Sequence, residues 1–253
     1  MNFQFVKGAL VAVALVLLGS TPARAADYAP FPNGSVLIDS STNGRWLIQG
    51  GARFMISVDE VPYFKNPFFT FTVAPSVIAA ITTIPRDGTT LQQRGDASIY
   101  VVVGGRAWGI PDMNELEHFG GTSGVRIIPW KSLHAFPLYF ARDGTMVRER
   151  SGAPVYVIFG NGKFWVPTSA DVEYYGGWDN VQVIPDGSAA TMDDAPSCGS
   201  RLRERSSGLI YLINNIAEKT LIVNPSSYDW ANHYVVPDGT LARFPDGVFF
   251  CIG

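Results

Sequence analysis

Short apolar stretches centred on an aromatic residue recur along the chain, and glycines or amides end them. In each stretch the residues at both alternating positions are apolar, which is typical of β-strands buried on both faces. The stretches are RWLIQGG (45–51), IYVVVGG (99–105), VYVIFG (155–160), IYLINN (210–215) and VFFCIG (248–253). Their aromatic residues are therefore predicted to occupy one equivalent position in successive structural units: Trp46, Tyr100, Tyr156, Tyr211 and Phe249.

A turn-forming triplet precedes each stretch and sets the period of a repeat. The first four triplets are NGS (33–35), DGT (87–89), DGT (143–145) and CGS (198–200), and their glycines are almost evenly spaced. A fifth triplet, Asp238-Gly239-Thr240, follows after a clearly shorter interval. The spacing therefore predicts four units and a half unit that duplicates the opening of unit one.

The second part of each unit has its own pattern. A further apolar stretch comes first, as in RAWGIP (106–111) and KFWVPT (163–168). Next is a polar segment with an acidic start and a glycine end, such as SADVEYYGG (169–177), which suits a short helix. A final strand and proline close the unit, as in VQVIP (181–185). Each unit is predicted to run strand, turn, strand, Gly-Gly turn, strand, helical turn, strand.

A unit of this size cannot bury both faces of its strands alone, so we expect the units to stack on one another. The predicted fold is mainly β, a single repeat domain over 26–253. A propeller-like stack of four-stranded units with short helical turns fits the fixed period and the short strands. An open array of small β-rich repeats is the alternative, because the half unit supplies no missing second half. The predicted units cover about 33–86, 87–142, 143–197 and 198–237, with the half unit at 238–253.

Residues 1–25 have the pattern of a secretory signal peptide. A positive segment ending at Lys7 precedes an apolar run from Ala9 to Leu18, and Ala23-Arg24-Ala25 supplies the small residues of a cleavage site. Ten apolar residues are too few to cross a hydrocarbon core of about 30 Å. We therefore expect a protein that is secreted or associated with the cell envelope, without a membrane span.

Composition and charge limit the classes of partner that we expect for this chain. Hydrophobic residues make up 47% and charged residues 16% of the chain, which indicates a folded protein. The formal net charge of −3 supplies no basic field of the kind on which nucleic-acid binding relies. No nucleic-acid partner is expected.

The only two cysteines, Cys198 and Cys251, are predicted to form a disulfide, because an exported chain meets an oxidising compartment. Cys198 opens unit four and Cys251 ends the half unit, so the bond would fasten a C-terminal cap to its neighbour. Two buried thiols that never meet are the alternative.

The DGT openers, the RWLIQGGARFMIS and IYVVVGG stretches and the IP and VxVIP endings resemble a tandem repeat of the same period in exported bacterial proteins, mainly of actinobacteria. The resemblance covers nearly all of 30–253. In those proteins the repeat often accompanies secreted hydrolases or cell-wall enzymes, which implies an accessory extracellular role. The repeat has no established activity, and it implies no catalytic residues.

No motif for catalysis or metal binding stands out. The three histidines show no metal-ligand spacing, and no nucleophile elbow occurs, so we predict no metal site, no cofactor and no catalytic residue. Asp112, Glu115 and Glu117 crowd one helical stretch. We interpret them as favourable negative charge at a helix start, with a cation site or an acid pair as the alternative.

Tryptophans are the candidate ligand-binding residues. Trp178-Asp179-Asn180 of unit three matches Trp230-Ala231-Asn232 of unit four, and Trp165 is predicted on the strand face opposite the core. An indole face can take the apolar face of a pyranose while amides and carboxylates bind its hydroxyls. The alternative is that each tryptophan packs under its own loop and each asparagine caps the backbone.

The resulting hypothesis is an exported, non-enzymatic repeat protein that binds a polymeric surface, a cell-wall or other glycan. A protein-interaction or structural module of the envelope is the second hypothesis, with Phe68, Phe69 and Phe71 as an apolar docking patch. A secreted hydrolase whose site is assembled from distant residues is the third.

Overall fold

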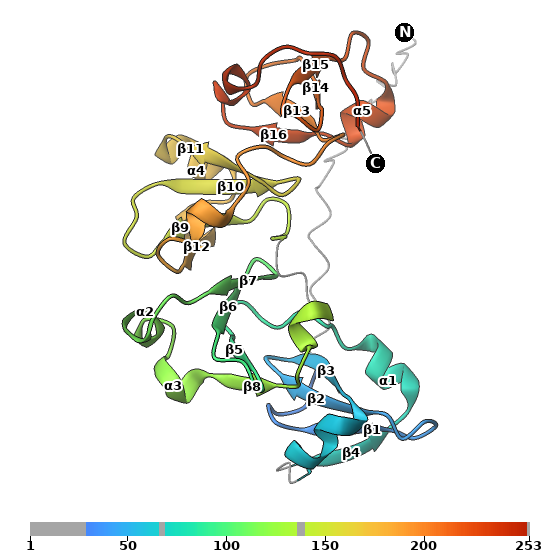
Figure 1. The fold of residues 1–253 in the computed structure, drawn as a ribbon. Helices are drawn as coiled ribbons and strands as arrows, with labels where there is room; N and C mark the ends of the chain where they lie inside the picture. Colours follow the sequence, from blue (N-terminus) through green and yellow to red (C-terminus); the bar gives the residue numbers. More distant parts are fainter. Residues whose placement is uncertain (1–28, 66–68, 136–139, 252–253) are drawn as a thin grey trace, which may run out of the picture.

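The computed structural model describes residues 29–65, 69–135 and 140–251, which form four four-stranded β-sheets of one topology (Figure 1). In every sheet the strand order is third, second, first, fourth. The first three strands form antiparallel hairpins, and the fourth returns parallel to the first. The mainly β repeat predicted from the sequence is confirmed. The signal peptide predicted over 1–25 lies outside the described residues.

The strands follow the predicted apolar stretches. They are β1 (Val36–Asp39), β2 (Arg45–Gln49), β3 (Ala52–Ile56) and β4 (Thr70–Val73) in unit one. Unit two has β5 (Thr90–Gln93), β6 (Ile99–Val103), β7 (Arg106–Gly109) and β8 (Arg126–Ile128). Unit three has β9 (Met146–Glu149), β10 (Val155–Phe159), β11 (Gly162–Val166) and β12 (Val181–Ile184). Unit four has β13 (Arg201–Glu204), β14 (Tyr211–Ile213), β15 (Lys219–Leu221) and β16 (Tyr234–Val236).

Short helices occupy two places in each unit. Between the third and fourth strands lie η1 (Val58–Tyr63), α2 (Met113–Glu117) with α3 (Gly121–Gly124), α4 (Ser169–Tyr174) with η3 (Trp178–Asn180), and α5 (Ser227–Ala231). After the fourth strand come α1 (Pro75–Ala80), η2 (Ser132–Ala135), η4 (Ser188–Thr191) and η5 (Thr240–Arg243).

The predicted aromatic position is confirmed in all four sheets. Each aromatic residue of the second strand lies directly opposite an aliphatic residue of the first strand. The pairs are Trp46 with Leu37, Tyr100 with Leu91, Tyr156 with Val147, and Tyr211 with Leu202. Phe249 does not belong to this set, because residues 248–251 form no strand.

The half unit expected at 238–253 is wrong as a copy of the opening of unit one. Gly239, at φ 81°, begins η5 as Gly187, at φ 83°, begins η4. Asp238-Gly239-Thr240 is therefore the turn that follows the fourth strand of unit four. The triplet misled the prediction because a left-handed glycine serves both kinds of turn.

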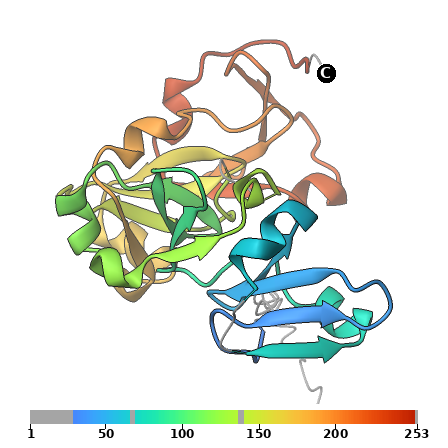
Figure 2. The same ribbon diagram turned by 60° about the horizontal axis from the view of Figure 1, so that its bottom comes forward.

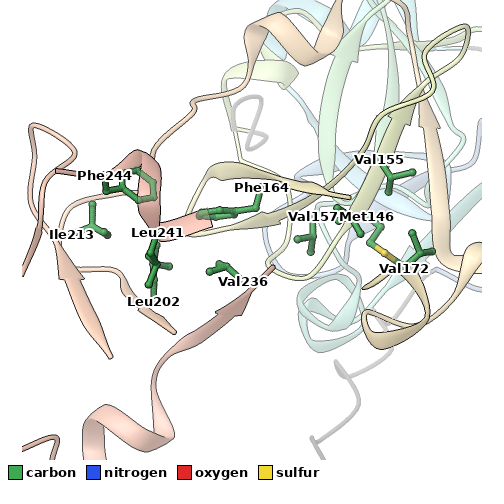
Figure 3. Packing of buried hydrophobic residues seen from close by; sticks show 11 residues of the cluster. Met146, Val155, Val157, Phe164, Val172, Leu202, Ile213, Val236, Leu241 and Phe244 are labelled. Atoms are coloured by element: carbon green, nitrogen blue, oxygen red, sulfur yellow. The ribbon is translucent and has the colours of Figure 1, made fainter. Parts of the chain in front are cut away.

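Successive sheets share buried cores, and each sheet is covered on both faces. On β10 the side chains of Val155 and Val157 pack toward unit four (Figure 3), while those of Tyr156 and Ile158 pack toward unit two. Other buried clusters join unit one to unit two, and unit two to unit three. Strands buried on both faces are thus confirmed.

Units one and four lie at opposite ends of the molecule in both views (Figures 1 and 2). Among the described residues no buried cluster joins these two units. The arrangement is therefore the open array, and the sheets do not close into a ring.

One arginine clasp recurs at all three junctions. An arginine directly after the first strand of each later unit pairs with a buried acid on the helix of the preceding unit. The pairs are Arg94 Nε with Glu60 Oε2 at 2.7 Å, Arg150 Nε with Glu115 Oε2 at 2.8 Å, and Arg205 Nη1 with Asp171 Oδ1 at 2.7 Å. Unit one has no preceding neighbour, and Ser40 stands where the arginine would be.

The Gly-Gly turns also hold the junctions together. Gly50, Gly104 and Gly160 have φ values of 57°, 61° and 54°, and a Cβ there would approach the hydroxyl side chain of the next unit's opening triplet within 2.5–2.6 Å. A side chain is therefore excluded by the backbone conformation and by the close approach.

Each end of the array is capped differently. At the N-terminal end Ala29 and Phe31 pack with α1 over the outward face of the first sheet. At the C-terminal end Arg201, Asn214 and Thr220 stand where unit three has apolar residues facing its neighbour. A polar outer face is typical of a terminal repeat.

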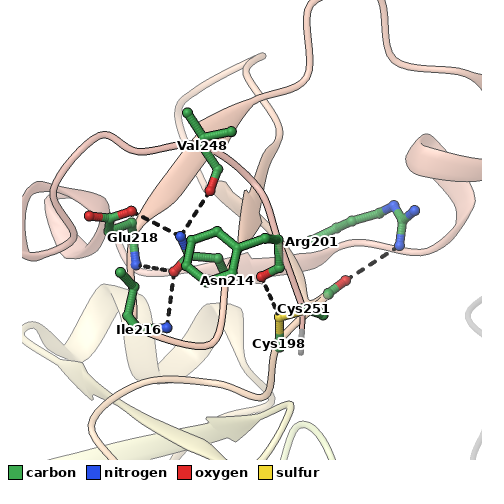
Figure 4. The surroundings of a disulfide bond; sticks show 9 residues. Cys198, Arg201, Asn214, Ile216, Glu218, Val248 and Cys251 are labelled. Atoms are coloured by element: carbon green, nitrogen blue, oxygen red, sulfur yellow. Dashed lines mark hydrogen bonds between the residues drawn. A yellow bond between two sulfur atoms is a disulfide. The ribbon is translucent and has the colours of Figure 1, made fainter. Parts of the chain in front are cut away.

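The C-terminal segment crosses this polar face, and a disulfide holds it there (Figure 4). Asn214 Nδ2 donates to the carbonyl of Val248 at 3.0 Å, and Thr220 Oγ1 donates to the carbonyl of Gly247 at 2.7 Å. Cys198 and Cys251 are bonded, with their Cα atoms 5.9 Å apart. The predicted disulfide is confirmed.

We expect the junction between units three and four to weaken in alkali. Tyr234 Oη donates to Asp143 Oδ2 at 2.8 Å, and burial, followed by this hydrogen bond, raises the pKa of Tyr234 to about 12. Burial also raises the pKa of Tyr175, whose hydroxyl donates to the carbonyl of Val235. Since both folded pKa values exceed the unfolded value of about 10, the stabilisation is complete below pH 10 and is lost as the pH rises toward 12.

Urea unfolding at pH 8, 10 and 11 measures this loss. The double variant Tyr175→Phe, Tyr234→Phe is the control, and its midpoint should fall less above pH 10. Parallel pH profiles for the two proteins would contradict the assignment.

Candidate functional site

All three candidate tryptophans are exposed. The exposed fractions are 58% for Trp165, 50% for Trp178 and 46% for Trp230. None of the indoles is therefore buried under its own loop, and each offers ring surface to a ligand.

Trp165 and Trp178 line one hollow of unit three, with a volume of about 300 Å³. On β11, Phe164 and Val166 point toward unit four, so Trp165 between them points the other way. Trp178 begins η3 after Gly177, whose φ of 87° reverses the chain. Pro154, Pro167, Thr168 and Ser169 are among the other lining residues. Strand alternation and a glycine turn thus bring together two indoles from separate segments of the unit.

The same place in unit two forms a hollow of about 540 Å³. Gly109 stands there in the position of Trp165, and Tyr100, Asp112 and Met113 line the wall. Met113 is 53% exposed. The hollow therefore recurs, but only unit three supplies indoles to it.

Unit four differs, although Trp230 matches Trp178 in the sequence. Trp230 lies inside α5, and its ring meets that of His233 edge-on with centroids 5.8 Å apart. Unit four has a hollow of about 500 Å³ at a different place, between its opening triplet and the end of α5. Gly199, Tyr228 and His233 are among its lining residues, and Trp230 is not. The stretch from the helix N-cap to the fourth strand is shorter in unit four, so Trp230 falls inside α5, at the position that Val172 takes in α4.

The polar neighbours of the two tryptophans have mostly structural roles. Asn180 Nδ2 donates to the carbonyl of Gly176, and Asn232 Nδ2 donates to the carbonyl of Tyr228 at 2.9 Å. Both amides therefore cap the backbone, which was the alternative prediction for them. Asp179 is exposed.

The carboxylates of α2 are also structural. Glu115 is buried and accepts from Arg150 Nε at 2.8 Å and from the Asp186 amide at 3.1 Å. Asp112 Oδ1 accepts from the Glu115 amide at 2.8 Å and so caps the helix. Within 29–65, 69–135 and 140–251, no group of three or more His, Cys, Asp or Glu side chains could hold a metal ion.

Asp229 of unit four is engaged in the same manner. A hydrogen bond from the Ser226 hydroxyl, and then one from Arg201 Nε at 2.7 Å, lower the pKa of Asp229 to about 2. This carboxylate is therefore ionised at neutral pH and serves to cap α5.

The structure describes only part of the predicted phenylalanine docking patch, in which the rings of Phe69 and Phe71 are stacked. Phe71 packs against Phe31 in the N-terminal cap with centroids 5.0 Å apart. Phe69 is 48% exposed, and Phe68 lies outside the described residues.

The sequence analysis missed a further hollow at the junction of units one and two, which Trp46 and Trp130 line. A signal for it existed, because Trp130-Lys131 replaces the Asp-Gly that follows the fourth strand of units three and four. Without the strand register, that replacement could not be aligned.

The fold defines the chain as a linear β repeat protein of four units. No protein-family model matches it, and no curated protein sequence matches it. Among solved structures, a chain of the periplasmic assembly from the ESX-5 inner membrane complex aligns with 90% of this chain and 95% of its own length. The two share 10% identity with a TM-score of 0.18, a value too low to carry an argument about fold or function.

None of the helices in the described part of the chain is long and apolar enough to cross a membrane.

Proposed function

We propose that this chain is an exported, non-enzymatic repeat protein that binds a polymeric glycan of the cell wall or the surroundings. The observation that carries the proposal is the pair of exposed indoles, Trp165 and Trp178, on one hollow. Indole faces take the apolar face of a sugar ring, and the nearby Ser169 supplies a hydroxyl group.

The repeat supports binding to a polymer in particular. Units two and three present equivalent hollows along one array, and a polymer offers more than one sugar ring to such an array. Two linked weak sites raise the overall affinity without new contacts. An exported location is supported by the signal pattern of 1–25 and by the disulfide, since disulfides persist in oxidising compartments.

Cosedimentation of the mature protein with insoluble peptidoglycan, chitin and cellulose tests the proposal. We expect retention on at least one polymer. The double variant Trp165→Ala, Trp178→Ala should bind at least tenfold more weakly, about 1.4 kcal/mol, because both ring surfaces are lost. Phe140→Ala is the matched control, since Phe140 is 52% exposed but does not line the hollow.

Two results would contradict the proposal in different ways. Unchanged retention of the double variant would reject the hollow while leaving glycan binding intact. Absence of retention of the unaltered protein on all three polymers would reject glycan binding.

A protein-interaction module of the envelope is the second candidate, and one observation favours it. Exposed apolar side chains are numerous in unit four, where Val248 is 78%, Val223 is 73% and Ile216 is 60% exposed. Polymers freed of protein separate the two candidates, because only a glycan-binding protein is retained on them.

A further inference from the structure

The junction of units one and two contains a hollow of about 260 Å³ that combines indoles with cations. Trp46, Arg53 and Met55 line it from β2 and β3, and Trp130 and Lys131 line it from the turn after β8. Met55 is 62% and Trp130 45% exposed. The described lining residues include no Asp or Glu, so Arg53 and Lys131 make the charge positive. The remaining walls are mainly apolar, with hydroxyl groups from Ser57, Thr83 and Ser132.

Within the described part of the chain, Arg53 lacks the acidic partner that its equivalents in units three and four possess. The third strands of units three and four carry Lys163 and Lys219 at the same register position. Lys163 Nζ pairs with Asp194 at 3.0 Å, and Lys219 Nζ pairs with Asp246 at 3.1 Å. Each aspartate comes from the segment that closes its own unit.

The backbone shows which residue of unit one takes the place of these aspartates. The amide of Arg53 donates to the carbonyl of Thr82, as the amide of Lys163 donates to the carbonyl of Asp193. Thr83 therefore corresponds to Asp194, and Thr83 lines the hollow. Unit one keeps the cation and replaces its carboxylate by a hydroxyl group.

Arg53 is nevertheless held in place. Its guanidinium lies over the Trp46 ring, 5.1 Å from the centroid, and Nη1 donates to the carbonyl of Ile78 at 2.8 Å. Its Nε is buried and has no hydrogen-bond partner among the described residues. The nearby Glu60, which accepts from the Trp130 amide, is paired with Arg94. The side chain is thus oriented, and Nη1 is the only guanidinium nitrogen that donates a hydrogen bond within the described residues.

Lys131 supplies the second cation, and its backbone is in a strained conformation. Its φ is 64°, in the left-handed region that Gly187 and Gly239 occupy at the same position of units three and four. A side chain in this conformation is strained, and such residues cluster at functional sites. The replacement of Asp-Gly by Trp130-Lys131 removes a negative charge, adds a positive one and supplies an indole to the hollow.

We propose that this hollow binds one sugar ring that bears a carboxylate. The carboxylate takes the place of the missing aspartate beside Arg53 and Lys131, and the ring packs on Trp46 and Trp130. The volume lies just below the range of about 300–1,000 Å³ for small-molecule pockets, which suits a single ring. The site deepens the proposed function and rests on it, because it makes the glycan an acidic one.

Isothermal titration calorimetry of the mature protein with glucuronic acid tests the site. We expect binding that weakens as salt is added, and at least tenfold weaker binding of glucose, which lacks the carboxylate, and of acetate, which lacks the ring. Thr83→Asp should reduce the affinity for glucuronic acid at least tenfold, because the restored carboxylate occupies Arg53. Thr83→Asn, of the same size as the aspartate but neutral, is the matched comparison, and its affinity should fall clearly less than that of Thr83→Asp.

A second variant keeps the test independent of Thr83. Lys131→Gly should weaken glucuronic acid binding while raising the melting temperature, since glycine tolerates the left-handed backbone. Failure of the unaltered protein to bind glucuronic acid would overturn the proposal. So would unchanged affinity in Thr83→Asp, or binding of inorganic phosphate as tight as that of glucuronic acid.

The same titrations separate this site from the hollow of unit three. The variant Trp165→Ala, Trp178→Ala should bind glucuronic acid as the unaltered protein does. If glucuronic acid fails to bind while polymer retention still depends on Trp165 and Trp178, the junction site is rejected and the proposed function stands.

Discussion

Replacing Glu115 by alanine is expected to lower the free energy of unfolding by about 3 kcal/mol, near the lower end of the range for breaking a buried ion pair. The Glu115 side chain is 5% exposed and accepts from Arg150 and from the Asp186 amide. Its removal leaves both donors without their acceptor at the junction of units two and three. The loss stays near the lower end because Arg150 is 34% exposed and keeps Asp186. Urea unfolding followed by tryptophan fluorescence measures it.

Glu117→Ala is the matched control, because Glu117 lies on the same helix but is exposed. This variant should change stability by no more than about 0.5 kcal/mol. A double replacement of Glu115 and Arg150 by methionine should recover much of the loss, since it leaves no unpaired buried charge. Equal unfolding midpoints for Glu115→Ala and Glu117→Ala would show that the clasp contributes nothing.

Replacing both cysteines by serine is expected to cost about 4 kcal/mol, as the chain-entropy account gives for a loop of this length. Cys198 and Cys251 are separated by 53 residues, and the bond holds the C-terminal segment across the outer face of unit four. Without it, the contacts of Thr220 and Asn214 with that segment must hold it alone. Thermal unfolding gives the size of the effect, and hydrogen exchange of unit-four amides gives its location.

Reduction of the unaltered protein supplies an independent measurement of the same bond. Dithiothreitol should lower the melting temperature of the unaltered protein toward that of the double serine variant and leave the variant unchanged. Faster exchange confined to unit four is expected in both. An unaltered melting temperature after complete reduction would contradict a stabilising role.

The sequence predicted the repeat and its strands well, for a physical reason. Burial on both faces requires continuous apolar runs, and such runs are visible without a structure. The equivalence of Trp46, Tyr100, Tyr156 and Tyr211 followed from the period alone and is confirmed. The disulfide is confirmed as well. Two cysteines allow only one pairing, so the sequence left open only whether the bond forms.

The errors arose where one local signal serves two structures. Asp-Gly before a small polar residue makes a left-handed turn in two places of a unit, so Asp238 to Thr240 was assigned to the wrong one. Trp178 and Trp230 match in sequence, yet the shorter stretch before the fourth strand of unit four places Trp230 inside α5. The three matching residues did not include the glycine turn that positions the indole of Trp178.

The junction contacts could not be predicted from one unit at a time. Arg150 and Glu115 are 35 residues apart in different units, and neither belongs to a recognisable motif. The same holds for Thr83, whose significance appears only when the strand register aligns it with Asp194. The missing carboxylate of unit one is recognised only when the units are aligned by their strand register.

The separate caps of the array have a consequence for its evolution. The N-terminal cap packs on the first sheet and the C-terminal segment covers the last one. The contacts of both caps are therefore independent of the number of units between them. Duplication or deletion of an internal unit would lengthen or shorten the protein without redesign of its ends. The number of hollows along the array would thereby change one unit at a time.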